Sequence, residues 1–166
     1  MIHIRFHSVY GSTKHYAESL AQSVDALSIG VLDVPIPSDG HPVVILSPVH
    51  GPSIAGIKVA QRYHETHPIA LVAVGMTLLD AAQKRDQMRS SAPERCARFY
   101  LPGRLDYSQL SSTHKAAMTS LVAFLKAKPL KNANDKSIIA GYNKVVDQVD
   151  VDKLQPVIEW ARSAAS

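Results

Sequence analysis

The feature that most constrains the fold is an alternation of short apolar runs and helical patterns along the first hundred residues. Two of the runs, VVILS at Val43–Ser47 and IALVAVG at Ile69–Gly75, are almost free of polar residues. Continuous apolar runs of this length are typical of strands that are buried on both faces, as in a parallel sheet. Because strands alternate with helices, the chain is predicted to form an α/β structure.

The alternation predicts a five-stranded parallel sheet with connecting helices on both of its faces. The predicted strands are Ile2–His7, Ile29–Val34, Val43–Ser47, Ile69–Gly75 and Ala97–Leu101. The predicted helices are Lys14–Leu27, Ile54–His64, Asp80–Met88 and Asp152–Ala165. Ligands of such sheets bind beyond the carboxyl ends of the strands. We therefore expect the chemistry in the loops at Ser8–Thr13, Pro48–Pro52, Gly75–Leu79 and Pro102–Tyr107.

The totals of the chain are those of an ordinary globular protein. Its 166 residues, 46% hydrophobic and 19% charged, are enough to bury roughly two-thirds of the unfolded surface in a single domain. One cysteine, Cys96, excludes an intrachain disulfide and a cysteine-rich zinc site. Arg5 and His7 interrupt the only early apolar run, so we expect no signal peptide and a cytoplasmic location.

A change of pattern after Tyr107 predicts an extra helical insert, at about 107–135, within the domain. Apolar residues from Leu110 to Leu125 follow helical spacing, Pro129 ends that run, and the polar stretch KNANDKS comes next. Lysines lie nearby at Lys115, Lys126, Lys128 and Lys131. We favour a surface helix that packs on the sheet, because amphipathic helices mostly face cores. The alternative is peripheral contact with the inner face of a membrane, where quinone is available.

The loop SVYGST, Ser8–Thr13, combines hydroxyl side chains with one glycine between a strand and a helix. Backbone N–H groups, hydroxyls and the positive end of the helix dipole can hold a phosphate there without a lysine. Gly11 can adopt backbone angles that are closed to other residues. The loop is neither a nucleotide P-loop nor a three-glycine dinucleotide fingerprint. On this loop alone, a helix cap formed by Ser12 or Thr13 is an equal alternative.

Four segments together resemble the flavodoxin-like family, specifically the branch of flavodoxin-domain proteins that includes menaquinone-dependent protoporphyrinogen oxidase. They are YGSTKHYAESLA, VVILSPVHGPSIAG, ALVAVGMTLLD and FYLPGRLDYSQLS, which follow or surround the first, third, fourth and fifth strands. These segments cover most of the chain in the expected order. The resemblance implies a flavodoxin-like doubly wound five-stranded parallel sheet with helices on both faces, and FMN as the cofactor.

The resemblance also implies which residues contact FMN. Its phosphate would lie in the first loop and its isoalloxazine ring between the loops after the third and fourth strands. The matching positions are Ser8, Tyr10, Gly11, Ser12 and Thr13 for the phosphate, and Pro48, Val49, His50, Gly51, Gly75, Met76 and Thr77 for the ring. The segment LPGRLDYS would introduce extra structure near the edge of the flavin.

The sequence departs from the electron-carrier flavodoxins at the ring. These carriers usually stack an aromatic side chain on the flavin, whereas neither ring-flanking loop here contains Trp, Tyr or Phe. His50 could stack on the ring or place a positive charge beside it. Tyr10 stands where the carriers commonly have threonine, although it leaves the backbone donors in place. Arg104 is the candidate to hold a substrate carboxylate, and a structural pair with Asp106 or another acid is at least as good an interpretation.

Three functions are compatible with these features. The first is an FMN-dependent oxidoreductase that passes electrons between a small-molecule substrate and a quinone, with no catalytic acid or base identified. The second is a flavodoxin-like electron-transfer protein, and the third is a flavin-free binding module. The net charge of +4 favours the first over an acidic carrier that docks on basic reductases. The basic residues are dispersed, so no nucleic-acid partner is predicted.

Two other features are weak candidates for a site. His64 and His67, in YHETHP, have no acidic or cysteine cluster near them in the sequence, and we interpret them as solvated residues at a helix end rather than metal ligands. Cys96 opens a predicted strand and is expected to be a small buried residue. We predict no metal site.

Overall fold

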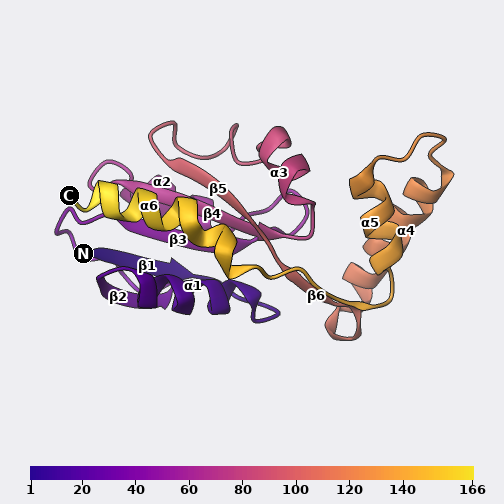
Figure 1. The fold of residues 1–166 in the computed structure, drawn as a ribbon, viewed down its shortest axis with the longest axis horizontal. Coiled ribbons are helices and arrows are strands. Elements are labelled where there is room, and N and C mark those ends of the chain that lie inside the picture. Colours follow the sequence, from indigo (N-terminus) through magenta and orange to yellow (C-terminus); the bar gives the residue numbers. More distant parts are fainter.

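The computed structural model describes all residues, 1–166, and its centre is a five-stranded parallel sheet (Figure 1). The strands are β1 (Ile2–Phe6), β2 (Ala26–Val31), β3 (Val43–Pro48), β4 (Ile69–Gly75) and β5 (Ala97–Pro102). Their spatial order is β2-β1-β3-β4-β5, and every pairing is parallel. This is the strand order of flavodoxin-like doubly wound sheets, as the sequence predicts.

Helices cover both faces of the sheet, which confirms the predicted layers. They are α1 (Ser12–Ser23) and α6 (Gln155–Ala164) on one face and α2 (Gly56–Tyr63) and α3 (Leu79–Arg85) on the other, and a short 3-10 turn, η2 (Val151–Leu154), precedes α6. Side chains of α1 and α6 share one buried cluster with Ile4, Leu46 and Val72. Ile45, Leu71 and Ala60 belong to the second cluster, on the opposite face. Strands β3 and β4 are therefore buried on both faces.

The second strand begins earlier than the sequence predicts. Helix α1 ends at Ser23 and β2 spans Ala26–Val31, so the predicted helix Lys14–Leu27 and strand Ile29–Val34 both have wrong boundaries. Leu27 continues the helical spacing of α1, but pairing with β1 holds this segment extended. Because β2 is the edge strand, its apolar residues Leu27, Ile29 and Val31 are exposed, and their pattern gave no clear strand signal.

No helix follows β2; residues 32–42 cross the sheet as a loop fixed by a buried arginine. Arg5, only 1% exposed, donates to the carbonyls of Val34 and Pro35 at 2.9 and 2.7 Å and to the hydroxyl of Ser28. Burial lowers the pKa of the guanidinium. Buried charges persist where they are fully hydrogen-bonded, so this loop takes the place of a helix.

An insert projects beyond the carboxyl ends of the strands, on the side opposite both chain termini (Figure 1). It consists of β6 (Arg104–Asp106), a 3-10 turn η1 (Tyr107–Gln109), α4 (Ser112–Ala127), α5 (Ala133–Gly141) and β7 (Val145–Asp147). Strands β6 and β7 form an antiparallel ribbon, and α4 packs against α5. The favoured interpretation that this helix packs on the sheet is therefore wrong, and the insert extends beyond the predicted 107–135.

Candidate functional site

The predicted site loops lie together at the carboxyl edge of the sheet. Strands β1 and β3 are neighbours, and from them the chain continues toward opposite edges of the sheet. This reversal is the topological switch point at which open α/β sheets bind ligands. The loop Ser8–Thr13 follows β1, and Pro48–Ser53 follows β3. Both loops therefore lie at the same part of the carboxyl edge of the sheet.

The N-cap residue of α1 makes no side-chain hydrogen bond to the helix. Gly11 is the N-cap residue, with φ at 87° in the left-handed region, and Ser12 and Thr13 lie inside the first turn. The hydroxyl of Ser8 accepts from the amide of Lys14 at 3.2 Å. The interpretation that Ser12 or Thr13 caps the helix is therefore wrong. The N–H groups of the first two helical residues have no hydrogen-bond acceptor within the helix. No acidic side chain occupies the first turn, so the dipole there favours an anion.

The loop after β3 forms a tight turn. His50 and Ser53 exchange two backbone hydrogen bonds of 2.9 and 3.0 Å around Gly51, whose φ is 58°. Gln87 donates to the carbonyl of Gly51 at 2.7 Å and holds the turn from outside. The amide of Val49 donates to Val74 at the end of β4. This turn is therefore held in one position relative to the next predicted ring loop.

The pKa of His50 is lowered, first by burial and then by the nearby His114 and His7. A histidine whose pKa lies below its ordinary value of about 6.5 is neutral at pH 7. The rings of His50 and His114 are stacked, with centroids 6.1 Å apart and an interplanar angle of 24°. The neutral form of the His50 imidazole is thus favoured in this structure, so His50 does not place a fixed positive charge at this position.

The loop after β4 is bonded to the insert. Gly75 accepts from the amide of Gly103 at 2.8 Å, which ties the loop to the end of β5. Leu78 donates its amide to the side chain of Asn134, at the start of α5, at 2.9 Å. Between these anchors, Met76 and Thr77 are half-buried. The insert therefore contacts both predicted ring loops, through His114 on one side and Asn134 on the other.

Sequence reasoning missed these two residues of the insert. The contacts of His114 and Asn134 join positions far apart in the chain, so no local pattern reports them. The helix that presents Asn134 did have a signal, because Asn132 and Asp135 form a capping box within KNANDKS. An Asn followed three residues later by an acidic side chain is a recognised helix start.

Tyr10 and Arg104 both lie near enough to Asp106 for their charges to interact. The pKa of Tyr10 is raised by burial and, to a smaller extent, by the Asp106 carboxylate. Asp106 accepts from the amide and hydroxyl of Ser108 and from Gln109, and these bonds lower its pKa. Arg104 is exposed and forms no ion pair. The interpretation of Arg104 as the direct partner of Asp106 therefore does not hold.

The hydroxyl of Tyr16 connects α1 to both ends of the insert. This side chain is fully buried, donates to the carbonyl of Pro102 at 2.6 Å, and accepts from the amide of Asp150 at 2.9 Å. Pro102 precedes the ribbon of the insert and Asp150 follows it. Burial is the main cause that raises the pKa of Tyr16. A single side chain therefore fixes the base of the insert beside the helix that follows the β1 loop.

We expect Tyr16→Phe to lower the free energy of unfolding by about 2 kcal/mol, because it leaves the carbonyl of Pro102 and the amide of Asp150, both in half-buried residues, without this partner. Urea unfolding followed by circular dichroism measures this change. Tyr63→Phe is the matched control, since the Tyr63 hydroxyl makes only a 3.4 Å bond with the amide of Ile36. Equal losses in the two variants would contradict the role of the Tyr16 bridge.

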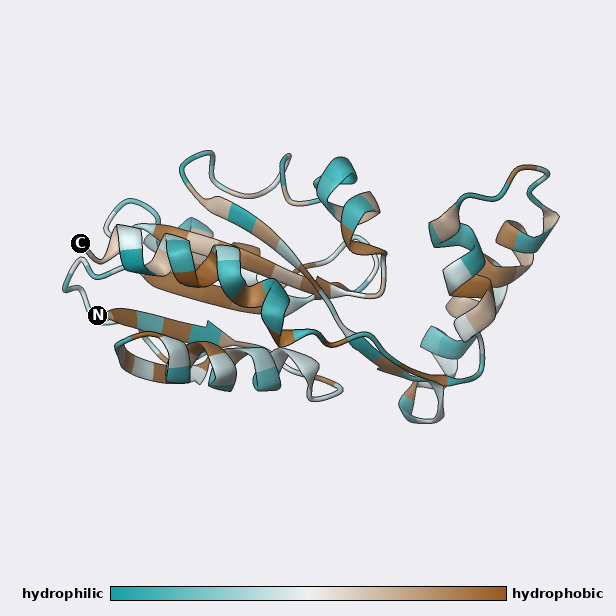
Figure 2. Ribbon diagram, in the orientation of Figure 1, coloured by the Kyte–Doolittle hydropathy of each residue, from teal (hydrophilic) through white to brown (hydrophobic).

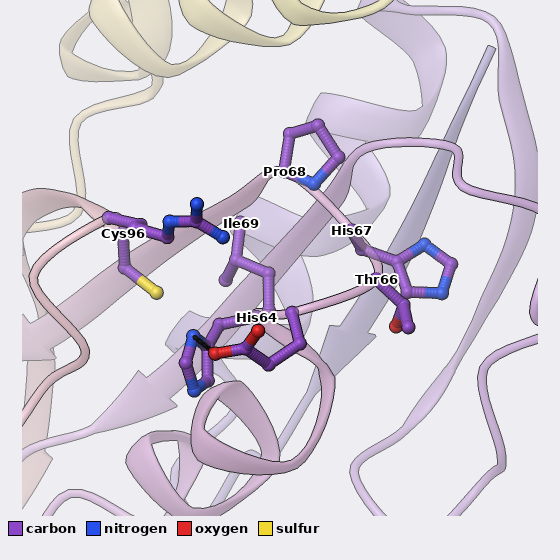
Figure 3. Close-up of a pocket in the computed structure, with 8 residues that line it drawn as sticks. His64, Thr66, His67, Pro68, Ile69 and Cys96 are labelled. Atoms are coloured by element: carbon purple, nitrogen blue, oxygen red, sulfur yellow. Dashed lines mark ion pairs between the residues drawn. The ribbon is translucent and has the colours of Figure 1, made fainter.

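Two cavities lie away from this edge, at the amino ends of the strands. One of about 270 Å³ lies at the amino ends of β4 and β5 and includes His64, His67 and Cys96 (Figure 3). In Figure 3 the ring of His67 points away from His64 and Cys96. His67 is buried, at 4% exposure, and bonds to the carbonyl of His41, so its interpretation as a solvated residue is wrong. No three His, Cys, Asp or Glu side chains converge to hold a metal, and Cys96 is buried as expected.

Comparison with known proteins gives one family and a structural neighbour. The family model that matches describes a flavodoxin domain and covers residues 3–132. Among solved structures, the chain is similar to a mutant flavodoxin from Pseudomonas aeruginosa at 14% identity and a TM-score of 0.34, over 74% of this chain and 95% of that one. No curated protein matches the chain.

Proposed function

Because the chain belongs to the flavodoxin domain family, we propose that it binds FMN and acts as a quinone-linked oxidoreductase similar to menaquinone-dependent protoporphyrinogen oxidase. The observation that carries this proposal is the amino terminus of α1, where no side chain accepts from the amides of Ser12 and Thr13. This terminus lies at the switch point of the sheet. It has free amides, a left-handed Gly11 and no acidic residue in the first turn. This set of donors fits a phosphate dianion.

The phosphate would be held by the amides and hydroxyls of Ser12 and Thr13, with Ser8 and Tyr10 on the same loop. A Cβ built on Gly11 would meet no atom within 4 Å, so the approach to the helix end is open. The left-handed backbone at this position nevertheless favours glycine, since other residues rarely adopt a φ of 87°. These residues would anchor the cofactor at its phosphate end.

The ring would lie between the two loops that the insert bridges. The candidates there are Pro48, Val49, His50 and Gly51 on one loop and Gly75, Met76 and Thr77 on the other. FMN, when bound, would supply the electron-transfer chemistry, and the protein would position substrate and exclude water. With no Trp, Tyr or Phe in either loop, the side chains of Val49 and Met76 and the neutral imidazole of His50 are left to contact the ring.

The insert favours an enzyme over a simple electron carrier. It contacts both ring loops, since His114 stacks on His50 and Asn134 accepts from the amide of Leu78, and so leaves less of the ring edge free for brief docking of a protein partner. Arg104, exposed at its base, would bind a substrate carboxylate through its bidentate guanidinium. The net charge of +4 agrees with an anionic substrate and not with a basic reductase as partner.

The first experiment is a titration of the purified protein with FMN, followed by visible absorption, with riboflavin as the control. We expect FMN to bind at least about a hundredfold more tightly than riboflavin, because only FMN can use the charge-assisted bonds at α1. Equal affinities would contradict the phosphate site. Absence of binding at tens of micromolar FMN would leave the flavin-free binding module as the function.

The second experiment separates the enzyme from the carrier. The reduced FMN complex is mixed without oxygen with menadione, a soluble naphthoquinone, and in parallel with a protein electron acceptor, the haem protein cytochrome c. We expect faster reoxidation by the quinone, and an Arg104→Ala variant to weaken use of protoporphyrinogen as donor without slowing that reoxidation. Preference for the protein acceptor would favour the electron-transfer protein instead.

A further inference from the structure

The outer side of α4 exposes apolar side chains that nothing in the chain covers. Phe124 is 68% exposed, Leu121 39%, and Leu130, just after the helix, 84%. Only Val122 and Leu125 of this helix are buried, and both face the hairpin interior formed with α5. Figure 2 colours segments of the projecting hairpin brown, the apolar end of its scale. A group of exposed apolar side chains marks an interaction surface.

The remaining exposed positions of α4 are unusually poor in charge. Lys115 and Lys126 are its only charged residues, and the helix contains no acid. Its other exposed residues include four alanines, Ala116, Ala117, Ala123 and Ala127. The polar side of a water-facing helix is normally rich in charged residues of both signs. This helix therefore has the composition of a surface that becomes buried when it binds a partner.

The whole net charge of the protein resides in the insert. Residues 104–147 contain seven Lys and Arg against three Asp, a net charge of +4 that equals the total, so the rest of the chain is neutral. Two of the acids are buried: Asp106 is bonded to Ser108 and Gln109, and Asp135 pairs with Lys128 at 2.7 Å. Asp147 is the one exposed acid of the insert. The accessible surface of the hairpin is therefore strongly basic.

We propose that the hairpin of α4 and α5 binds the surface of an anionic lipid membrane, with Phe124, Leu121 and Leu130 at the boundary of headgroups and acyl chains and the lysines on the headgroup phosphates. Basic residues near such a surface are attracted by its negative potential. Burial of the large apolar side chains adds a hydrophobic contribution to the binding. None of the helices has the length and hydropathy that crossing a bilayer requires.

Charge and size favour lipid over a protein on this surface. A second copy of the chain would bring a hairpin with the same net charge of +4, and like charges that face each other in one interface repel. A stable protein interface uses about 20–30 residues on each side, far more than three large apolar side chains with lysines around them. Long lysine side chains also reach headgroups in many geometries. A fluid anionic surface accepts this arrangement.

The shape of the molecule allows the contact. The hairpin stands clear of the sheet at the end opposite both chain termini, so a flat surface can reach it without meeting the helices of the sheet (Figure 1). Its inner contacts, His114 with His50 and Asn134 with Leu78, join it to the predicted ring loops. A membrane-bound hairpin would hold the site beside the lipid phase. The lipid contact itself does not depend on flavin binding.

The test is sedimentation of the full-length protein with large unilamellar vesicles. We expect binding to an equimolar mixture of phosphatidylglycerol and phosphatidylcholine, and at least tenfold weaker binding to phosphatidylcholine alone. The double variant Phe124→Ser/Leu130→Ser should bind the anionic vesicles at least tenfold more weakly. Ile29→Ser/Val31→Ser is the matched control, because both side chains are exposed, at 45% and 52%, on β2. Its binding should be unchanged.

Several results would overturn the proposal. These are no binding of the wild type at millimolar anionic lipid, equal binding to the two kinds of vesicle, or equal losses in the two double variants. Analytical ultracentrifugation of the same proteins tests the competing occupant. A dimer that dissociates in Phe124→Ser/Leu130→Ser, without vesicle binding by the wild type, would assign the surface to a second copy. Circular dichroism confirms that each variant is folded.

Discussion

Ser12→Asp is expected to abolish the preference for FMN over riboflavin while leaving the protein folded. An aspartate at the first position of α1 suits the positive end of the helix dipole, which stabilises a helix by about 0.3–1 kcal/mol. The same carboxylate would stand beside the phosphate of FMN, where like charges repel. We expect FMN affinity to fall on the order of a hundredfold, or about 2.7 kcal/mol. Riboflavin, which has no phosphate, should bind as it does to the wild type.

The Ser12→Asp variant is informative because its expected effects on helix stability and on FMN affinity have opposite signs. Unfolding in urea reports the helix, and flavin titration by absorption reports the phosphate site, so loss of fold cannot be mistaken for loss of the site. Gln22→Glu is the control: it adds one negative charge to the same helix about 15 Å away. Gln22 is exposed near the carboxyl end of α1. If both variants weakened FMN equally, net charge rather than the α1 terminus would explain the effect.

The sheet was predictable because its central strands are buried on both faces. Val43–Ser47 and Ile69–Gly75 differ from the observed β3 and β4 by at most one residue, since continuous apolar runs admit few other positions. The edge strand was misplaced for the opposite reason. Apolar side chains of β2 face water on one side, so burial leaves no periodic signal, and pairing with β1 decides where the strand begins.

The loops of the candidate site could be predicted from the sequence, whereas the contacts that the insert makes with them could not. Each loop follows a strand, so strand order alone brings Gly11 and His50 to one edge of the sheet. These contacts come from the insert, whose two helices pack against each other and not against the sheet. An amphipathic stripe reports that α4 buries one side against something, and it does not report whether the partner is a sheet or α5. Side chains such as His114 consequently have no signal in the sequence.

Replacing residues 107–144 with Asn-Gly should leave a folded protein that still binds FMN but has lost the lipid surface. Asp106 and Val145 are directly paired across the ribbon of β6 and β7. An Asn-Gly dipeptide closes such a pair with a two-residue turn. Neither buried cluster of the sheet includes a residue from 104–147, so both cores survive the deletion. We expect FMN affinity to stay within about tenfold of the wild type, since the α1 site is untouched.

Two quinone acceptors then separate the roles of the insert. With soluble menadione, the reduced deletion protein should be reoxidised at a rate close to that of the full chain, because the quinone reaches the flavin through water. With menaquinone dissolved in phosphatidylglycerol vesicles, the rate should fall at least tenfold, because the hairpin no longer holds the site at the lipid. Equal rates with the vesicles would show that the hairpin is dispensable for lipid-borne quinone. Loss of both rates would instead place the insert in the catalytic site itself, through contacts such as that of His114 on His50.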